Sequence, residues 1–254
     1  MRMNFPAEVD ERQDARAREL DAIGFRRLAT RVRSCGTRAF FPGFPQTVAC
    51  KTRICPRCAE RIAARNARRV VSAVRRFDRP IAYLATMPSM WNLSKSLFGF
   101  REGLAHLRRR ACFRTVAGGV SAIETKVADD GMQWQVHAHL VLDDGGLDLA
   151  AVAKAWAKFT TIFATNWHGG FELHRDPKID LRNVNGLAAY ICKLDTWCPA
   201  PNPNDADSLR RLETLFNALR YRRLLIAWGK AARPSNHEVL DEQTNPGNSA
   251  NRRG

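Results

Sequence analysis

The chain has 254 residues, of which 45% are apolar and 26% charged, so it can bury the core of one large domain, and wholesale disorder and fibrous repeats are excluded. Its 41 Lys and Arg residues outnumber its 25 Asp and Glu residues and leave a net charge of +16, which predicts a polyanionic partner. No apolar run approaches the ~20 residues of a membrane span, and charged residues instead of a signal-peptide core follow Phe5 and Pro6. We therefore expect a cytoplasmic protein that does not enter a membrane.

Shifts in composition predict four segments along the chain. Residues 1–78 hold an N-terminal helix, a cysteine module and a basic helix, residues 79–198 form the main domain, residues 199–240 hold a linker and a C-terminal basic helix, and residues 241–254 form a disordered tail.

The first segment combines helices with a loop. Apolar residues at helical spacing predict one helix over residues 8–33, although Gly24 weakens its continuity. Residues 36–52 place three phenylalanines among prolines and glycines, which favours a metal-stapled loop. The helix after Cys58 has one apolar face, and elsewhere on it runs a basic stripe that includes Arg61, Arg65, Arg68 and Arg76. This stripe is equally typical of a DNA contact and of a solvated helix face.

Four of the seven cysteines cluster in this segment, namely Cys35, Cys50, Cys55 and Cys58. An odd count in a chain without a secretion signal favours metal binding over disulfides. The Cys-Pro-Arg-Cys knuckle with two further thiols predicts a tetrahedral, structural Zn²⁺ site that braces the basic helix. A redox Cys-x-x-Cys is the rival, but the preceding loop does not resemble the strand that leads into a redox motif.

The main domain interleaves strands with helices, which predicts an α+β fold. We expect strands at 81–86, 120–127, 133–142 and near 171–173, a helix at 93–110 that ends in the triplet Arg108, Arg109 and Arg110, a helix capped by Asp148, a helix at 186–194 capped by Asn185, and a basic helix at 207–228 after a proline-bearing linker.

An Asp-Gly pair at 130–131 is a predicted two-residue turn between two alternating strands. With this pair at the centre of the turn, the residue numbers of any two opposed positions add up to the same value. This places Glu124 opposite His137 and Ala122 opposite His139. The side chains of that glutamate and the two histidines then share one face, with opposed Cβ atoms roughly 5 Å apart. The other face is apolar and is expected to form core.

These three side chains are candidate metal ligands. Two imidazoles and a carboxylate leave coordination positions open for water or substrate, and the mixed nitrogen and oxygen set suits Mg²⁺ or Mn²⁺, with Zn²⁺ possible. The alternative is a pair of exposed histidines that bind no ion. A change of one residue in the turn length would remove the glutamate from the set.

Tyr190 and Lys193 lie three residues apart on a predicted helix and therefore on one side of it. A phenol is a weak nucleophile at neutral pH, and a neighbouring ammonium with a metal-polarised electrophile would favour its attack. Alone, such a pair is typical of surface decoration, so its weight comes from the metal hairpin and the basic charge of the same chain.

The motifs in this order resemble those of bacterial plasmid rolling-circle replication initiators, which belong to the HUH endonuclease superfamily. The resemblance covers roughly residues 35–197. It rests on the cysteine module, on Tyr83-Leu84-Ala85-Thr86-Met87-Pro88 at the first strand motif, on Ile123-Glu124-Thr125 and Val136-His137-Ala138-His139-Leu140 at the metal motif, and on Ala189-Tyr190-Ile191-Cys192-Lys193 at the nucleophile helix.

The resemblance implies a central antiparallel sheet flanked by helices and a metal-dependent strand transferase. Tyr190 would attack a phosphodiester in single-stranded or extruded-hairpin DNA, form a 5′-phosphotyrosine and free a 3′-hydroxyl primer. Lys193 would orient the phosphate, and an ion held by Glu124, His137 and His139 would polarise it. Origin DNA, single-stranded and duplex, and the host replication helicase and polymerase are the implied partners.

Two positions depart from the family pattern. Ala138 is small where the family usually has a bulky residue, and Gly186 stands where single-tyrosine initiators often carry a glutamate that activates water at termination. Termination chemistry is therefore unassigned, because the nearest downstream carboxylate, Asp195, lies on another helix face. The alternatives are a transposase of the same superfamily and a zinc-binding DNA-binding regulator whose histidines and tyrosine are structural.

Overall fold

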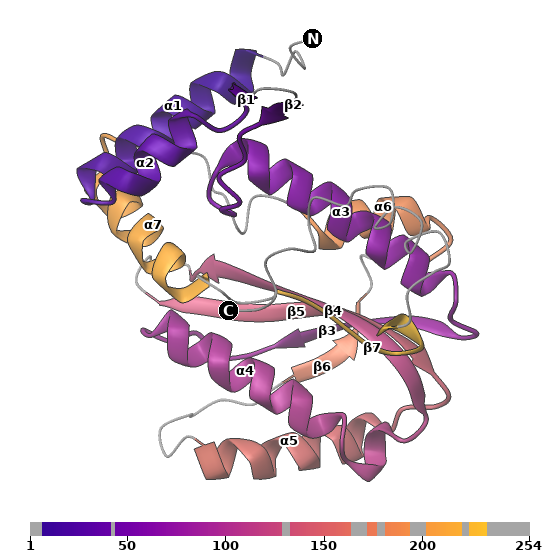
Figure 1. The fold of residues 1–254 in the computed structure, drawn as a ribbon. Helices are drawn as coiled ribbons and strands as arrows, with labels where there is room; N and C mark the ends of the chain where they lie inside the picture. Colours follow the sequence, from indigo (N-terminus) through magenta and orange to yellow (C-terminus); the bar gives the residue numbers. More distant parts are fainter. Residues whose placement is uncertain are drawn as a thin grey trace.

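A computed structural model describes residues 7–41, 44–128, 133–163, 172–176, 181–193, 202–219 and 224–232. The predicted α+β class is confirmed, since a five-stranded antiparallel sheet is flanked by helices (Figure 1). The strands stand in the order β6-β3-β5-β4-β7, with bounds β3 Pro80–Thr86, β4 Val116–Val127, β5 Trp134–Asp144, β6 Glu172–Arg175 and β7 Leu225–Gly229. No helix in this described part is long and apolar enough to cross a bilayer.

The hairpin of β4 and β5 lies at the centre of the sheet and has the predicted register. Glu124 pairs with His137, and Ala122 pairs with His139. The pairing continues outward to Val127 opposite Trp134, while the turn residues 129–132 lie outside the described residues. Both strands are longer than predicted, because the pairing also extends toward Val116 and Asp144 across an irregularity.

Helices cover both faces of this sheet. Helices α4 (Leu93–Leu107) and α5 (Leu149–Phe163) lie on one side in Figure 1, and α3 (Pro56–Val74) and α6 (Val184–Ile191) lie on the other. The first pair packs on Ile123, Val136, Ala138 and Leu140. The second pair packs on Val120, Ala122 and Val141. The face that carries the two histidines is therefore also packed, which strand alternation alone did not predict.

The prediction of one continuous helix over residues 8–33 is wrong. It is two helices, α1 (Ala7–Ala22) and α2 (Arg26–Arg33), separated at Gly24 with φ of +83°. A glycine in the left-handed region ends α1, and the backbone N–H of Phe25 donates to the Leu20 carbonyl at 2.7 Å to close the turn. The expected loop after Gly36 contains a short hairpin of β1 (Arg38–Phe41) and β2 (Phe44–Thr47).

Buried polar side chains tie this N-terminal module together. The Gln13 amide donates to the carbonyls of Val32, Arg33 and Cys35 at 2.7 to 3.0 Å, which satisfies carbonyls at the end of α2. Arg16 and Glu19 form a buried ion pair. The Glu19 carboxylate also accepts from the backbone N–H of Asn202 at 2.6 Å, so that the segment before α7 (Ala206–Leu219) is held on α1.

Three further predicted elements differ in their bounds. The helix predicted over 207–228 ends at Leu219, and the apolar residues that follow form β7, which adds to the free edge of β4. Helix α4 stops at Leu107, three residues short of the predicted end. Helix α6 begins at Val184 and is capped by Asn183, whose side chain accepts from the Gly186 N–H at 2.9 Å, instead of by Asn185.

Other predictions stand as made or fall outside the described residues. The strand predicted over 81–86 and the Asp148 cap are confirmed, since the Asp148 carboxylate accepts from the backbone N–H groups of Ala150 and Ala151. Residues 198–201 of the predicted linker and the tail predicted over 241–254 lie in the part that is not described.

Candidate active site

The predicted ligands Glu124, His137 and His139 meet on the face covered by α3 and α6. Glu124 Oε2 lies 3.1 Å from His137 Nε2 and 3.7 Å from His139 Nε2. One ligand atom from each side chain lies within 4.8 Å of the others. Two ligands at ~2.1 Å from one ion are about 3.0 Å apart in octahedral geometry and about 3.4 Å apart in tetrahedral geometry. The cluster could therefore hold a metal ion.

Burial supports the same interpretation. Glu124 and His139 are nearly fully buried. Within the described part of the chain, Glu124 Oε1, His137 Nδ1 and His139 Nε2 are buried and have no hydrogen-bond partner. Leaving a buried polar atom unpaired costs about 1 to 3 kcal/mol, and such atoms are rare in native proteins. A cation offers the carboxylate and the imidazole lone pairs the partner they lack, so the donor set fits a metal ion.

Asp176 belongs to this cluster and was missed by the sequence analysis. Its buried Oδ2 lies 2.8 Å from His139 Nδ1. With the proton on Nδ1, that nitrogen donates to Asp176, and Nε2 turns its lone pair toward Glu124. Strand pairing explains its position: His174 on β6 pairs with Leu84, which pairs with His139, and a period of two extends the same face to Asp176. The sequence alone does not show this pairing.

The surrounding charges keep Glu124 ionised. Burial acts to raise the pKa of its carboxyl, but the hydrogen bond with His137, the nearby His139 ring and the charge of Lys193 together outweigh burial and lower the pKa to about 2. Lys193 Nζ lies 3.2 Å from Glu124 Oε2. The glutamate is therefore in its cation-binding form at neutral pH.

Helix α6 brings the predicted nucleophile to the metal ligands. Leu187, Ala188 and Ile191 of α6 are buried in the core shared with α3 and the sheet. This packing leaves Tyr190 half-buried, with its ring centroid 4.9 Å from that of His139. Lys193, just past the end of α6, places Nζ 4.7 Å from the centre of the Tyr190 ring. Residues predicted as two separate motifs thus form one site.

The four predicted zinc ligands also converge. Cys35, Cys50, Cys55 and Cys58 are buried thiols whose sulfurs lie within 4.8 Å of one another. Cys58 Sγ is 3.4 Å from Cys35 Sγ and 3.5 Å from Cys50 Sγ. Sulfurs on a tetrahedral Zn²⁺ are ~3.8 Å apart, whereas a disulfide requires ~2.05 Å. Hydrogen bonds from the other three thiols, led by Cys35, lower the pKa of Cys58, which favours a thiolate. This group could hold a second metal ion.

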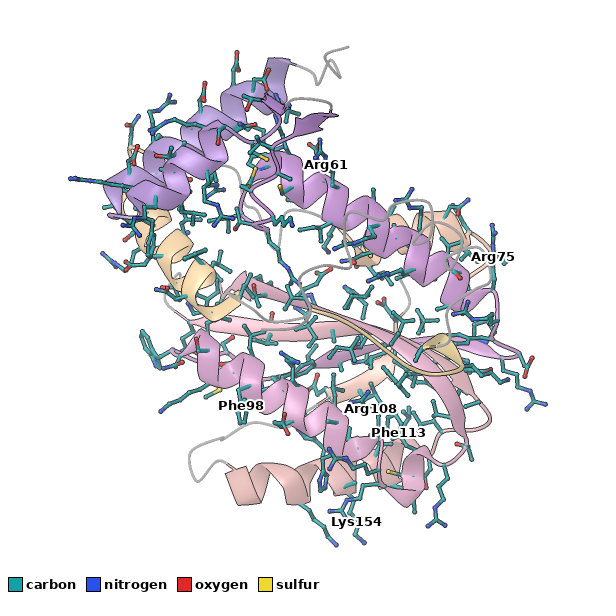
Figure 2. All side chains as sticks on the ribbon, viewed as in Figure 1. Arg61, Arg75, Phe98, Arg108, Phe113 and Lys154 are labelled. Carbon is teal, nitrogen blue, oxygen red and sulfur yellow. The ribbon has the colours of Figure 1, made fainter. Side chains whose placement is uncertain are left out.

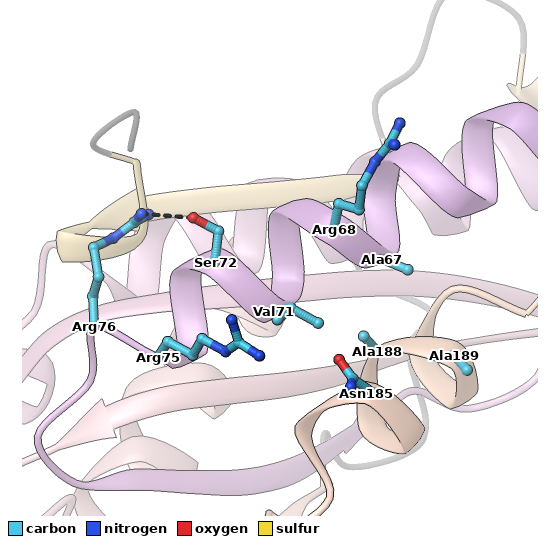
Figure 3. Close-up of a pocket in the computed structure, with 9 residues that line it drawn as sticks. All are labelled: Ala67, Arg68, Val71, Ser72, Arg75, Arg76, Asn185, Ala188 and Ala189. Atoms are coloured by element: carbon cyan, nitrogen blue, oxygen red, sulfur yellow. Dashed lines mark hydrogen bonds between the residues drawn. The ribbon is translucent and has the colours of Figure 1, made fainter. Parts of the chain in front are cut away.

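The predicted basic stripe lies on α3, on the same side of the sheet as the metal cluster. Arg65 and Arg68 are exposed and Arg61 is half-buried. Figure 2 shows Arg61 and Arg75 toward opposite ends of this helix. A groove of about 720 Å³ separates α3 from α6, and Figure 3 shows Arg68 on its α3 wall and Asn185 on its α6 wall. Helix α6, which carries Tyr190, thus borders a basic groove.

The arginine triplet lies elsewhere. It follows α4, which covers the opposite face of the sheet. The Arg108 guanidinium lies 5.0 Å from the centroid of the Trp228 ring, a stacking contact that stabilises β7 against α4. Arg109 and Arg110 are exposed, and Arg110 Nε donates to His106 Nε2 at 2.8 Å. The structure therefore brings the α3 arginines, but not this triplet, to the side of the metal cluster.

The two departures from the family pattern have local explanations. A Cβ at Gly186 would lie 2.6 Å from the Asn183 amide, so the cap that starts α6 excludes a longer side chain there without rearrangement. Ala138 is completely buried in the core beneath α4 and α5. Asp195 lies outside the described residues.

Comparison of the chain with family models, with curated proteins and with solved structures yields no match. The interpretation of the site rests on its own residues, on their distances and on their burial.

We expect Cys58→Ser to weaken the four-cysteine site. Loss of one thiolate should reduce the metal bound there and lower the melting temperature by about 5 °C or more, roughly 2 kcal/mol for a chain of this size. Elemental analysis and thermal unfolding followed by circular dichroism measure both effects. Cys112→Ser, a half-buried cysteine outside the cluster, is the control. Unchanged metal content in Cys58→Ser would refute the assignment.

Asp176→Asn should weaken metal binding at the Glu124 cluster while leaving the fold intact. An amide can no longer hold His139 in the ligand tautomer through a charged acceptor, and such positioning carboxylates typically contribute 10- to 100-fold in affinity, so a loss of about that size is expected. Calorimetric titration with Mn²⁺ measures it. Glu172→Gln, an exposed carboxyl on β6, is the matched control. Equal affinities in the two variants would contradict the role given to Asp176.

Proposed function

We propose that the chain is a DNA nickase and strand transferase that initiates rolling-circle replication. Its central sheet would carry the catalytic residues as the sheet of the HUH endonucleases does. The observation that carries this proposal is the convergence of Tyr190 and Lys193 from α6 on Glu124, His137 and His139 from β4 and β5. A nucleophile, a fixed ammonium and a metal site together are what transfer of a phosphodiester to an enzyme requires.

In the proposed reaction, Tyr190 replaces the 3′ oxygen at the scissile phosphorus. Tyr190 Oη forms a bond to the phosphorus of the scissile phosphodiester, and the bond between phosphorus and the 3′ oxygen breaks. The phenol proton is transferred, in net terms, to the released 3′ oxygen, so the products are a 5′-phosphotyrosine and a 3′-hydroxyl primer. Attack by a 3′-hydroxyl in the reverse sense joins strands. Lys193 offsets the negative charge that develops between the ring and the phosphate.

The donor sets suggest which ions serve. The mixed cluster of Glu124, His137 and His139 suits Mg²⁺ or Mn²⁺, and an ion held by these residues would supply the positive charge that polarises the scissile phosphate. The four thiols suit Zn²⁺ in a closed structural site. The two sites would thus have different tasks, since an ion in the first would contact the reacting phosphate and an ion in the second would brace the start of α3.

The surroundings of the site suit a DNA strand. Arg68 of α3 and Arg75 just past its end are exposed and line the groove beside α6, where they would supply affinity for phosphates without reading the sequence. A 3′-hydroxyl primer is useful only where the host replication polymerase and helicase act, so these enzymes are the proposed partners and the cytoplasm is the proposed compartment.

Tyr190→Phe should abolish both nicking and covalent attachment, because no other atom of the site replaces Oη. The assay incubates the chain with its own supercoiled replicon and Mn²⁺ or Mg²⁺, and follows nicked circles and protein-bound DNA. Tyr83→Phe is the control, since the Tyr83 ring belongs to the core on the opposite face. Glu124→Ala and His139→Ala should lower cleavage but largely keep duplex binding.

The same assay separates the alternatives. Nicking that persists in Tyr190→Phe would refute the assignment of the nucleophile. Binding without nicking in any metal would favour the zinc-binding regulator. Cleavage at transposon ends instead of an origin would favour the transposase of the same superfamily.

The double variant Arg65→Ala and Arg68→Ala should bind single-stranded DNA about tenfold more weakly at moderate salt. Two lost phosphate contacts should also reduce the slope of log affinity against log salt by ~1.4. Fluorescence anisotropy at several salt concentrations measures both. Arg109→Ala with Arg110→Ala removes equal charge from the opposite face and should have a much smaller effect. Equal losses would show that charge, and not position, determines binding.

A further inference from the structure

A second pocket, of about 840 Å³, lies at the N-terminal module, away from the metal cluster. It is bounded by residues 24–28 and Arg31 around α2, by residues 50–54 of the cysteine loop, and by Phe216 and Leu219 of α7. Cys50 belongs to the four-cysteine group, and no other residue of this lining belongs to the Glu124 cluster, the Tyr190 helix or the α3 stripe. The pocket therefore has no role in the chemistry described above.

The charged residues that line this pocket are all basic. Five basic residues line it, Arg26, Arg27, Arg31, Lys51 and Arg53, and no acidic residue is among the described lining residues. The first four form no ion pair within the described chain. Arg26 and Arg27 occupy the first turn of α2, where the helix dipole disfavours positive charge and where no acidic residue offsets it. This placement opposes helix stability and suits the binding of an anion.

The positive lining is also held in place. An Arg31 guanidinium nitrogen donates to the Cys50 carbonyl at 2.7 Å, which joins α2 to the cysteine loop. Lys51 has a positive φ of 57°, and the thiol cluster anchors the loop on both sides of it. Arg53 lines the pocket three residues before α3 begins, so the positive lining reaches the start of the helix that carries the arginine stripe.

Aromatic rings complete the pocket. Phe25 and Phe216 are both half-buried, and their ring centroids are 5.0 Å apart at 60°. Rings beside converging guanidinium groups offer a stacking surface for a planar group that carries a phosphate. Base-paired DNA keeps its bases stacked inside the duplex, so only an unpaired nucleotide can use both features.

We propose that this pocket binds an unpaired nucleotide of a DNA strand, with the phosphate held by the basic residues of α2 and the cysteine loop and the base packed on Phe25 and Phe216. The site rests on the proposed function in naming DNA as the ligand. Helix α3 starts beside the pocket and leads to α6, so the strand held here continues along the arginine stripe to Tyr190.

Binding of a labelled oligothymidylate to the full chain, without added Mg²⁺ or Mn²⁺, tests the phosphate contacts independently of nicking. Arg26→Ala with Arg27→Ala should weaken binding about tenfold and reduce the salt slope by ~1.4. Arg12→Ala with Arg18→Ala removes equal charge from α1 outside the pocket and should change binding little. Equal losses in both pairs, or an equal loss for a duplex of the same length, would overturn the proposal.

The base contact needs a separate measurement. The wild-type chain should bind oligothymidylate about tenfold more tightly than an abasic strand of equal length, as expected for one stacked base. Phe25→Leu, which keeps an apolar side chain, should bring this ratio close to one, whereas Phe98→Leu, an exposed ring on α4, should preserve it. A ratio unchanged in Phe25→Leu would overturn the base contact.

Crosslinking locates the nucleotide directly and does not depend on a variant's folding. Ultraviolet irradiation of the chain with a bromodeoxyuridine-substituted strand should join the base to a peptide that contains Phe25 or Phe216, identified by mass spectrometry. Crosslinks confined to other peptides would refute the site. If the pocket tests succeed while the nicking assay fails, the pocket stands and the strand-transferase proposal falls; the opposite pattern removes only the pocket.

Discussion

The antiparallel pairing of β4 with β5 in a single register is the constraint on which the site depends. Opposed residues on one face lie close enough to share an ion, and a slip of one residue would move every side chain of a strand to the other face. Glu124 would then point into the core under α4 and α5, where Ile123 and Ala138 now pack. The apolar residues that alternate with the ligands thus resist the slip, so core packing and ligand geometry specify the same register.

The position of Tyr190, the proposed nucleophile, is determined by a second packing constraint. Helix α6 is short and would be marginal alone, so its burial against α3 and the sheet determines where its ends lie. Leu187 and Ile191 sit one turn apart on the buried side. That orientation leaves Tyr190 at the edge of the core, beside His139. Because α3 carries both the packing surface for α6 and the exposed arginines, one helix positions the nucleophile and the proposed strand contact.

The sequence patterns predicted the elements that neighbouring residues determine. They missed the elements that depend on contacts with residues distant in the sequence. The hairpin followed from an Asp-Gly turn and alternation, and the thiol cluster followed from spacing. At Gly24 the sequence showed only a residue of low helix propensity, and this did not by itself predict that the helix ends there. Strand β7 was mistaken for helix because its apolar residues suit either structure, and the free edge of β4 selects the strand. Asp176 could not be found without knowing that β6 pairs with β3, since its role arises across two strands from His139.

The net charge of +16 combines basic residues with different physical roles, and the fold separates them. Arg16 is buried with Glu19, and Arg108 stacks on Trp228; both hold elements together and contribute little to binding a polyanion. Arg65 and Arg68 are exposed on the side of the sheet where the candidate metal ligands lie, so their charge would act on a phosphate that approaches Tyr190 in the proposed reaction. The proposed affinity for DNA should therefore depend on a minority of the basic residues, because exposed charge favours the proposed strand transfer only where it lies along the path to Tyr190.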